Sequence, residues 1–130
     1  ASDILVKALE LWGPTGEGGC QGSLRRGKGS DAWTVEKGSY KLKQDAYCLY
    51  GGIGMAAQGK PMYEDAGRAG SEHSKALMYV RKAITERSGR HIDIANYNDY
   101  SNGFAPIKAA VCAALKYALA DEDKETNHEG

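Results

Sequence analysis

The chain has 130 residues, 42% of them hydrophobic and 26% charged, and its 17 Lys and Arg residues balance its 17 Asp and Glu residues. This size and composition are those of one soluble domain with a substantial core. No apolar run reaches the roughly 18 residues of a membrane span, and the start of the chain lacks a signal-peptide pattern, so we expect a cytoplasmic protein with no membrane contact.

The balanced charge hides an asymmetry along the chain. Residues 121–130 carry five acidic side chains and one Lys, whereas residues 21–43 carry six basic and two acidic side chains. Charged chain ends are commonly solvated and disordered. We therefore predict a single globular domain over residues 1–120 and a disordered acidic tail over residues 121–130.

The first predicted helix covers residues 2–12, with Ser2 or Asp3 as its N-cap and Gly13 at its end. Seven glycines within residues 13–30 exclude a regular helix there. Residues 21–26 fit a short edge strand, and residues 32–35 and 40–42 flank a turn and predict a β-hairpin. The apolar face of the first helix is formed by Ile4, Leu5, Ala8, Leu9 and Trp12.

Residues 45–58 are predicted to form the helix at the centre of the fold. After Asp45 this stretch has no charge, and its apolar residues cover every face of a helix, which is typical of a buried one. Gly51, Gly52 and Gly54 weaken helix propensity, so we expect them to let neighbouring segments approach closely.

Two more helices follow. After a loop over residues 59–70, Ser71 is expected to cap a helix that ends near Arg87. Residues 91–95 read as extended, residues 96–104 as turns, and a last amphipathic helix starts at Pro106. Its core face contains Ile107, Val111, Ala114, Leu115, Ala118 and Leu119, and that of the preceding helix Ala76, Leu77, Val80, Ala83 and Ile84. The predicted class is a mostly helical α+β domain, with about four helices packed around the central one and a small β-hairpin.

Four features in order resemble a family of small uncharacterised proteins from actinobacteria and their phages. They are Trp12 after the first helix, Gln21-Gly22, the run Cys48-x-x-Gly-x-Ile, and the Tyr97-Asn-Asp turn before the last helix. The resemblance covers roughly residues 3–120 and departs from the family where Tyr97 replaces a usual tryptophan and residues 101–104 replace a Gly-Arg-Thr. It implies a shared fold and a bacterial or phage source, and it implies no activity.

The three cysteines, Cys20, Cys48 and Cys112, are few and widely spaced, which predicts free thiols in a reducing compartment. Cys20 lies in the glycine-rich loop and should be the most accessible thiol, and Cys112 reads as part of the core. Cys48 at the start of the central helix, followed in the chain by His91 and Asn98, has the order of a cysteine hydrolase or transferase. A buried structural cysteine explains Cys48 more simply.

Neither a metal nor a cofactor is indicated. The histidines and cysteines lack the spacing of a metal site. Residues 22–28 fit the pattern G-x-x-x-x-G-K, but Gly29 stands where Ser or Thr should hold Mg²⁺, and no strand or helix flanks the run as a phosphate loop requires. We therefore expect no metal and no cofactor.

The polar pair Asn98 and Asp99 has two interpretations. One of them caps a turn and ties the loop to the central helix through side-chain to backbone hydrogen bonds. Alternatively the loop binds a partner, because aromatic residues crowd around the pair and aromatics are enriched at binding hot spots. The candidate binding residues are Tyr97, Asn98, Asp99, Tyr100 and Phe104.

Function is predicted largely from what the sequence lacks. With no complete catalytic set and no cofactor motif, we expect a small non-catalytic binding or regulatory protein of phage or bacterial origin, acting on a protein partner in the cytoplasm, a host protein if phage-encoded. A Cys48-dependent enzyme is the alternative. A third reading is weak nucleic-acid binding through the basic residues Arg25, Arg26, Lys28, Lys41 and Lys43, which the neutral overall charge disfavours.

Overall fold

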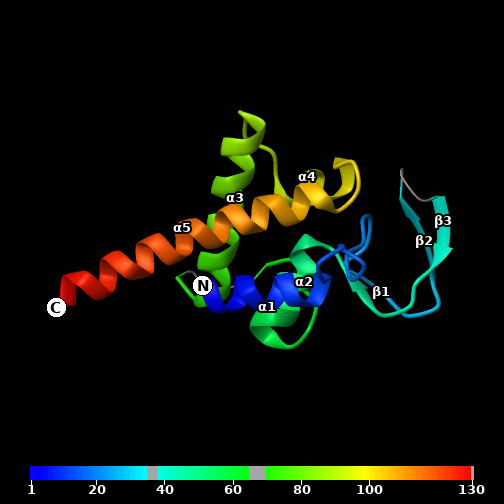
Figure 1. Ribbon diagram of the computed structural model, residues 1–130, viewed down its shortest axis with the longest axis horizontal. Coiled ribbons are helices and arrows are strands. Elements are labelled where there is room, and N and C mark those ends of the chain that lie inside the picture. Colours follow the sequence, from blue (N-terminus) through cyan, green and yellow to red (C-terminus); the bar gives the residue numbers. More distant parts are fainter. Residues whose placement is uncertain (35–37, 65–69, 130) are drawn as a thin grey trace.

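The computed structural model describes residues 1–34, 38–64 and 70–129. Within these ranges the predicted mostly helical α+β class is confirmed. Figure 1 shows an elongated molecule with a β-hairpin at one end and the C-terminal part of the last helix at the other. The helices are α1 (Ser2–Trp12), α2 (Leu49–Gln58), α3 (Glu72–Ser88), α4 (Ile94–Tyr100) and α5 (Ala105–Glu129), and the strands are β1 (Arg25–Arg26), β2 (Asp31–Thr34), β3 (Gly38–Lys41) and β4 (Ala46–Tyr47).

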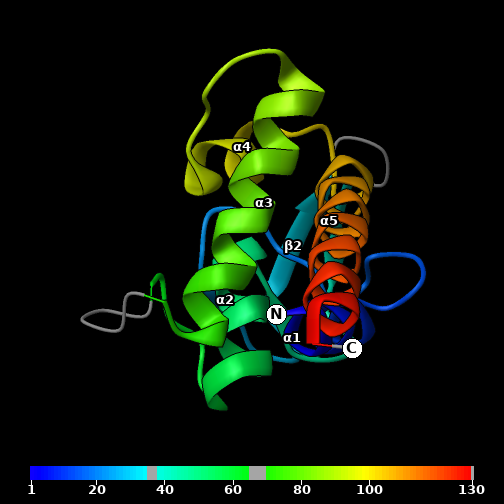
Figure 2. The ribbon, with the colours of Figure 1, turned by 90° about the vertical axis from the view of Figure 1, so that its left-hand side faces the viewer.

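The core lies where α1, α2, α3 and α5 meet, because each of these helices turns an apolar face toward the others. Figures 1 and 2 together show α3 crossing α5, with α1 and α2 packed beneath them. The predicted apolar faces of α1 and α3 contribute to this core together with residues of α2 and α5. Its fully buried side chains include Leu5, Ala8, Trp12, Leu49, Ile53, Val80, Ile84, Ile107 and Val111.

The central helix is shorter than predicted, because residues 46 and 47 pair as β4 with β1 instead of joining it. Its glycines do allow close approach. A Cβ on Gly51 would lie 2.0 Å from the carbonyl oxygen of Leu24, and one on Gly52 would lie 2.5 Å from the ring of Trp12 on α1. Gly54 faces the backbone of Met62 in the following loop. Two of the three glycines therefore meet loops, and one meets a helix.

Strands β2 and β3 form the predicted hairpin in an antiparallel register that runs from Asp31 opposite Lys41 to Thr34 opposite Gly38. The predicted turn overlaps residues 35–37, which lie outside the described residues. The edge strand expected over residues 21–26 shrinks to the two residues of β1.

Helix α3 has the predicted bounds. The Ser71 hydroxyl caps it by accepting a hydrogen bond from the amide of Ser74 at 3.1 Å, and Gly89 ends it in a left-handed conformation. The segment after it differs from prediction, because residues 94–100 are helical as α4. The Asp93 carboxylate caps this helix by accepting a hydrogen bond from the amide of Asn96 at 2.8 Å.

Helix α5 continues through the acidic segment to Glu129. Two of its carboxylates have partners on other helices. Asp121 accepts a hydrogen bond of 2.8 Å from the hydroxyl of Tyr79, and Glu122 accepts hydrogen bonds from both the amide and the hydroxyl of Ser2. In the described part of the chain, no helix is long and apolar enough to cross a membrane.

Candidate functional site

Asn98 of α4 is the residue that joins this short helix to the centre of the fold. Its side chain is almost fully buried. The side-chain oxygen accepts a 2.9 Å hydrogen bond from the amide of Leu49, the first residue of α2, and the side-chain nitrogen donates to the carbonyl of Cys20 at 3.2 Å. Asn98 thus makes the predicted side-chain to backbone tie to the central helix.

The glycine-rich segment holds α4 from the other side. The Gln21 side chain donates to the carbonyls of Asn98 and Ser101, both at 2.7 Å, and the amide of Gly22 donates to the carboxylate of Asp99 at 2.8 Å. Helices of seven residues are marginal alone. These tertiary hydrogen bonds are therefore what give α4 a defined position.

Two of the candidate aromatic residues belong to the packing of this region. The Tyr97 hydroxyl donates to the carbonyl of Pro106 at 3.2 Å, which links α4 to α5. The rings of Phe104 and Trp12 lie 5.4 Å apart, and Phe104 also covers Gly19, where a Cβ would come within 2.5 Å of the ring. Phe104 therefore supports the fold and does not offer a free aromatic surface.

Tyr100 differs from them, because 86% of its surface is exposed. It lies at the edge of an open hollow of about 600 Å³ between α4 and the segment that connects α3 to α4. Its wall combines polar and apolar groups on a fixed framework, which is the composition of many binding sites. The hollow is lined by Arg90, His91, Ile92, Asp93, Asn96, Tyr97, Tyr100 and Ser101.

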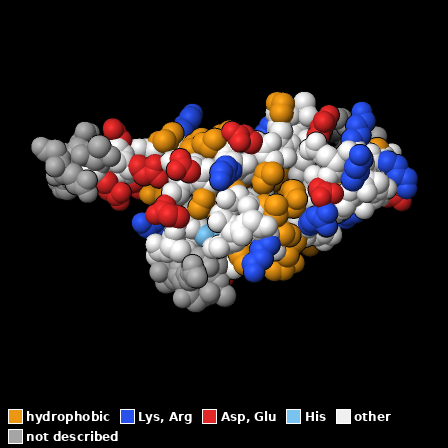
Figure 3. Space-filling model, turned by 90° about the horizontal axis from the view of Figure 1, so that it is seen from below, with side chains coloured by type: hydrophobic (Ala, Val, Ile, Leu, Met, Phe, Trp, Pro, Cys, Tyr) orange, Lys and Arg blue, Asp and Glu red, His pale blue; other side chains and the backbone are white. Residues whose placement is uncertain are grey.

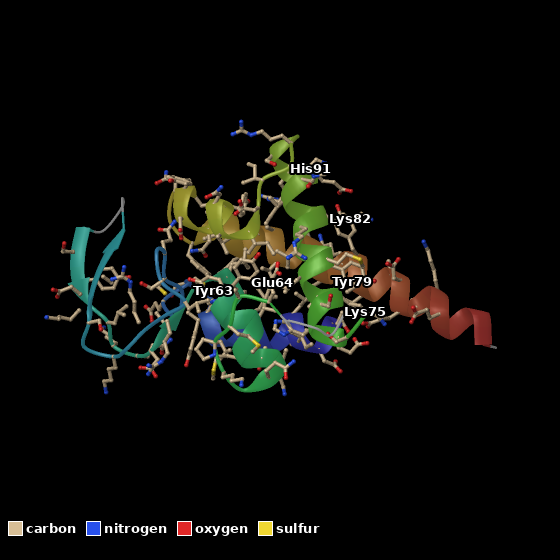
Figure 4. All side chains as sticks on the ribbon, turned by 180° about the vertical axis from the view of Figure 1, so that it is seen from behind. Tyr63, Glu64, Lys75, Tyr79, Lys82 and His91 are labelled. Carbon is tan, nitrogen blue, oxygen red and sulfur yellow. The ribbon has the colours of Figure 1, made fainter. Side chains whose placement is uncertain are left out.

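The charged groups around the hollow differ in the hydrogen-bond and ion-pair partners that they have. The Asp93 carboxylate accepts hydrogen bonds from both the amide and the side chain of Asn96. The Arg90 guanidinium forms no ion pair with any described residue. His91 bonds Thr85 across 3.3 Å, and Figure 4 shows it at the far end of α3 from Lys75. The hollow therefore offers an exposed aromatic ring and a cation that forms no ion pair with any residue that the structure describes.

The arrangement does not assemble a cysteine-based catalytic centre. Cys48 is buried, and its sulfur accepts a hydrogen bond from the amide of Gly51 at 3.3 Å as the N-cap of α2. Burial raises the pKa of the Cys48 thiol, opposite to the lowering that a helix N-terminus alone would cause. Asn98 lies next to Cys48 but serves the backbone, and among the described residues no hydrogen bond joins Cys48 to His91.

The predicted exposures of the other two thiols were wrong. Cys112 is exposed on α5, whereas Cys20 is buried. Burial and the neighbouring Cys48 raise the pKa of the Cys20 thiol to about 12. Within the ranges that the structure describes, His, Cys, Asp and Glu form no group of three that could bind a metal ion.

The predicted basic patch gathers at the hairpin end of the molecule, and Figure 3 shows Lys and Arg side chains there and acidic ones toward the end of α5. Part of its charge is neutralised. Arg25 pairs with Asp45 at 2.7 Å, and Lys41 pairs with Asp31 at 2.9 Å. Arg26 donates to backbone carbonyls, while Lys28 and Lys43 are exposed.

Sequence reasoning missed Arg90 and Ile92 as neighbours of Tyr100. The sequence places both residues just after the predicted end of α3. It did not show that residues 94–100 are helical, and this helix is what brings Arg90 and Ile92 to the same hollow as Tyr100. Gln21 was noted only as part of a motif, and its role in holding α4 depends on contacts between residues almost eighty positions apart.

Comparisons with known proteins give one result. The model of a family of unknown function, DUF6197, matches residues 1–121. Searches of curated proteins and of solved structures found no match.

Proposed function

We propose that this chain, which belongs to the family of unknown function DUF6197, is a small non-catalytic binding or regulatory protein. It recognises a protein partner through the hollow beside α4. The observation that carries this proposal is the exposed Tyr100 on a helix whose position is fixed by buried hydrogen bonds.

Exposed tyrosine on a rigid support suits recognition. A tyrosine side chain has few rotatable bonds and presents a large amphipathic surface, so little conformational entropy is lost on binding. Because Asn98, Gln21 and Asp99 fix the backbone of α4, the ordering cost of the helix is already met by folding. The same argument does not apply to Phe104, which is used in packing.

Charge supports the same surface. Arg90 forms no ion pair with a described residue, an arginine side chain can bind a carboxylate on a partner in a bidentate manner, and arginine is enriched with tyrosine at interface hot spots. Arg90 and Tyr100 line the same hollow.

The proposal extends to a bacterial or phage source and to a partner in the cytoplasm, which is a host protein if a phage encodes the chain. No observation favours the Cys48-dependent enzyme, because its thiol is buried.

A comparative pull-down tests the proposal. Tagged parent protein, Tyr100→Ala and the control Tyr63→Ala are each incubated with cytoplasmic extract of the source bacterium or phage host, and bound proteins are quantified by mass spectrometry. Tyr63 is also exposed, by 59%, but lies elsewhere, against Tyr50.

A hot-spot tyrosine costs about 2 kcal/mol or more when truncated, which corresponds to roughly 30-fold weaker binding. We expect Tyr100→Ala to lose a partner that Tyr63→Ala retains, with both variants melting like the parent. If both variants retain the same proteins as the parent, the hollow is not the binding site.

A further inference from the structure

Cys20 and Cys48 lie beside each other although 28 positions separate them in the chain. The amide of Tyr47 donates to the carbonyl of Gly18 at 2.8 Å, and the amide of Cys20 donates to the carbonyl of Tyr47 at 3.0 Å. These two hydrogen bonds define a parallel bridge between Gly19 and Tyr47. Cys20 and Cys48 each follow a bridged residue by one position.

One residue further along the same parallel register, Cys20 is opposite Cys48. Paired residues on adjacent strands lie about 4.8 Å apart and point to the same side, and a disulfide bridges Cα atoms about 4.4–6.8 Å apart. Both thiols are free and belong to the same core cluster, with exposures of 7% and 6%. Continuing this register by one residue gives the two side chains a spacing and a direction that suit a disulfide.

A third residue holds the two backbones in this arrangement. Asn98 donates to the carbonyl of Cys20 and accepts from the amide of Leu49, the residue after Cys48. The hydrogen bonds of both sulfurs are local and weak: Cys20 donates to the carbonyl of Ser23 and Cys48 accepts from the amide of Gly51, both at 3.3 Å. A disulfide would replace one hydrogen bond and leave the Asn98 contacts in place.

We propose that Cys20 and Cys48 form a redox-active dithiol that is oxidised to an intramolecular disulfide by exchange with a small disulfide such as oxidised glutathione. The Cys48 thiol loses its proton to solvent, and the thiolate attacks one glutathione sulfur, which releases the other glutathione as a thiolate. Cys20 then loses its proton and attacks the Cys48 sulfur of the mixed disulfide, which releases the second glutathione. Two electrons pass from the protein to glutathione.

The bond would fasten the glycine-rich segment to the start of α2. That segment also carries Gln21 and Gly22, which hold α4 in position. Because both thiols are buried, exchange on the folded protein requires the segment to open, so oxidation is slow in the native state and fast during refolding. The dithiol does not depend on the proposed function and holds even if the hollow binds nothing.

Mass spectrometry tests this proposal. The variant Cys112→Ser, which lacks the exposed thiol, is unfolded, reduced and refolded in a buffer of reduced and oxidised glutathione. Remaining thiols are blocked with N-ethylmaleimide. Refolding removes any barrier of access in the native state. We expect a product lighter than the reduced protein by two hydrogens, a linked peptide containing Cys20 and Cys48, and a melting temperature raised by about 5 °C or more.

A second variant separates the dithiol from general thiol chemistry. Cys20→Ser in the same background should gain no rise in melting temperature on oxidation. The proposal is overturned if refolded protein carries two blocked thiols or glutathione on a single cysteine, or if the linked form melts below the reduced form.

Discussion

Replacing Asn98 with alanine removes the polar side chain that joins α4, the glycine-rich segment and α2. Two buried backbone groups lose their partners, namely the amide of Leu49 and the carbonyl of Cys20. An unsatisfied buried group costs about 1–3 kcal/mol, so we expect Asn98→Ala to lower the free energy of unfolding by about 2–6 kcal/mol. Small domains have total stabilities of about 5–15 kcal/mol, so a loss of this size is easily measured.

Urea unfolding measured by circular dichroism and tryptophan fluorescence gives this free energy, provided that the two signals coincide. The control is Asn96→Ala on the same helix, because Asn96 is exposed and its side chain donates to the carboxylate of Asp93. We expect the control to lose less than about 1 kcal/mol. If Asn98→Ala is no less stable than Asn96→Ala, then Asn98 does not position α4 and the argument for a rigid binding surface fails.

Three further predictions concern close packing, thiol access and pH. Gly51→Ala should lower the free energy of unfolding by about 3 kcal/mol or more, because its Cβ would lie 2.0 Å from a carbonyl oxygen. Gly59→Ala should cost about 1 kcal/mol, because φ is +77° there but the space around the Cβ is open. Equal losses of the two variants in urea unfolding would contradict this. Iodoacetamide should modify only Cys112 in the folded protein and all three cysteines in denaturant, and fast labelling of a buried cysteine would refute the placement. Hydrogen bonds from Ser2 hold the pKa of the Glu122 carboxyl below its usual range, so the stability advantage of the parent over Glu122→Gln should be present above about pH 4.3 and shrink as the pH falls; an advantage that grows toward low pH would reverse the sign.

Periodicity predicted the helices that pack with a regular apolar face. In each of these helices apolar residues recur every three or four positions. Leu5, Val80 and Val111 are examples, and they are buried as expected. Cys112 was misplaced because it follows Val111 in a continuous apolar run, where each step rotates the side chain by about 100° around the helix. A stricter use of the same geometry would have placed it outside.

The elements that were missed depend on distant partners. The run Asn96 to Asp99 has turn chemistry, and α4 forms there because Asp93 caps it and Asn98 and Gln21 anchor it. The acidic end of α5 continues as a helix where Asp121 meets Tyr79. The sequence offered Asn98 or Asp99 as the tie and Tyr100 as one of five candidate binding residues. The hollow beside Tyr100 could not be predicted, because it depends on how α4 folds against residues 90–93.

The central claim is that the surface beside Tyr100 contacts a protein partner. Site-specific photo-crosslinking tests it most directly, with Tyr100→p-benzoylphenylalanine and, as a matched control, Tyr63→p-benzoylphenylalanine, each expressed in the cytoplasm of the source bacterium or phage host. The account predicts a discrete crosslinked band from position 100 that is absent from position 63 and is lost when Arg90→Ala is added. No band from position 100, or the same bands from both positions, would contradict it.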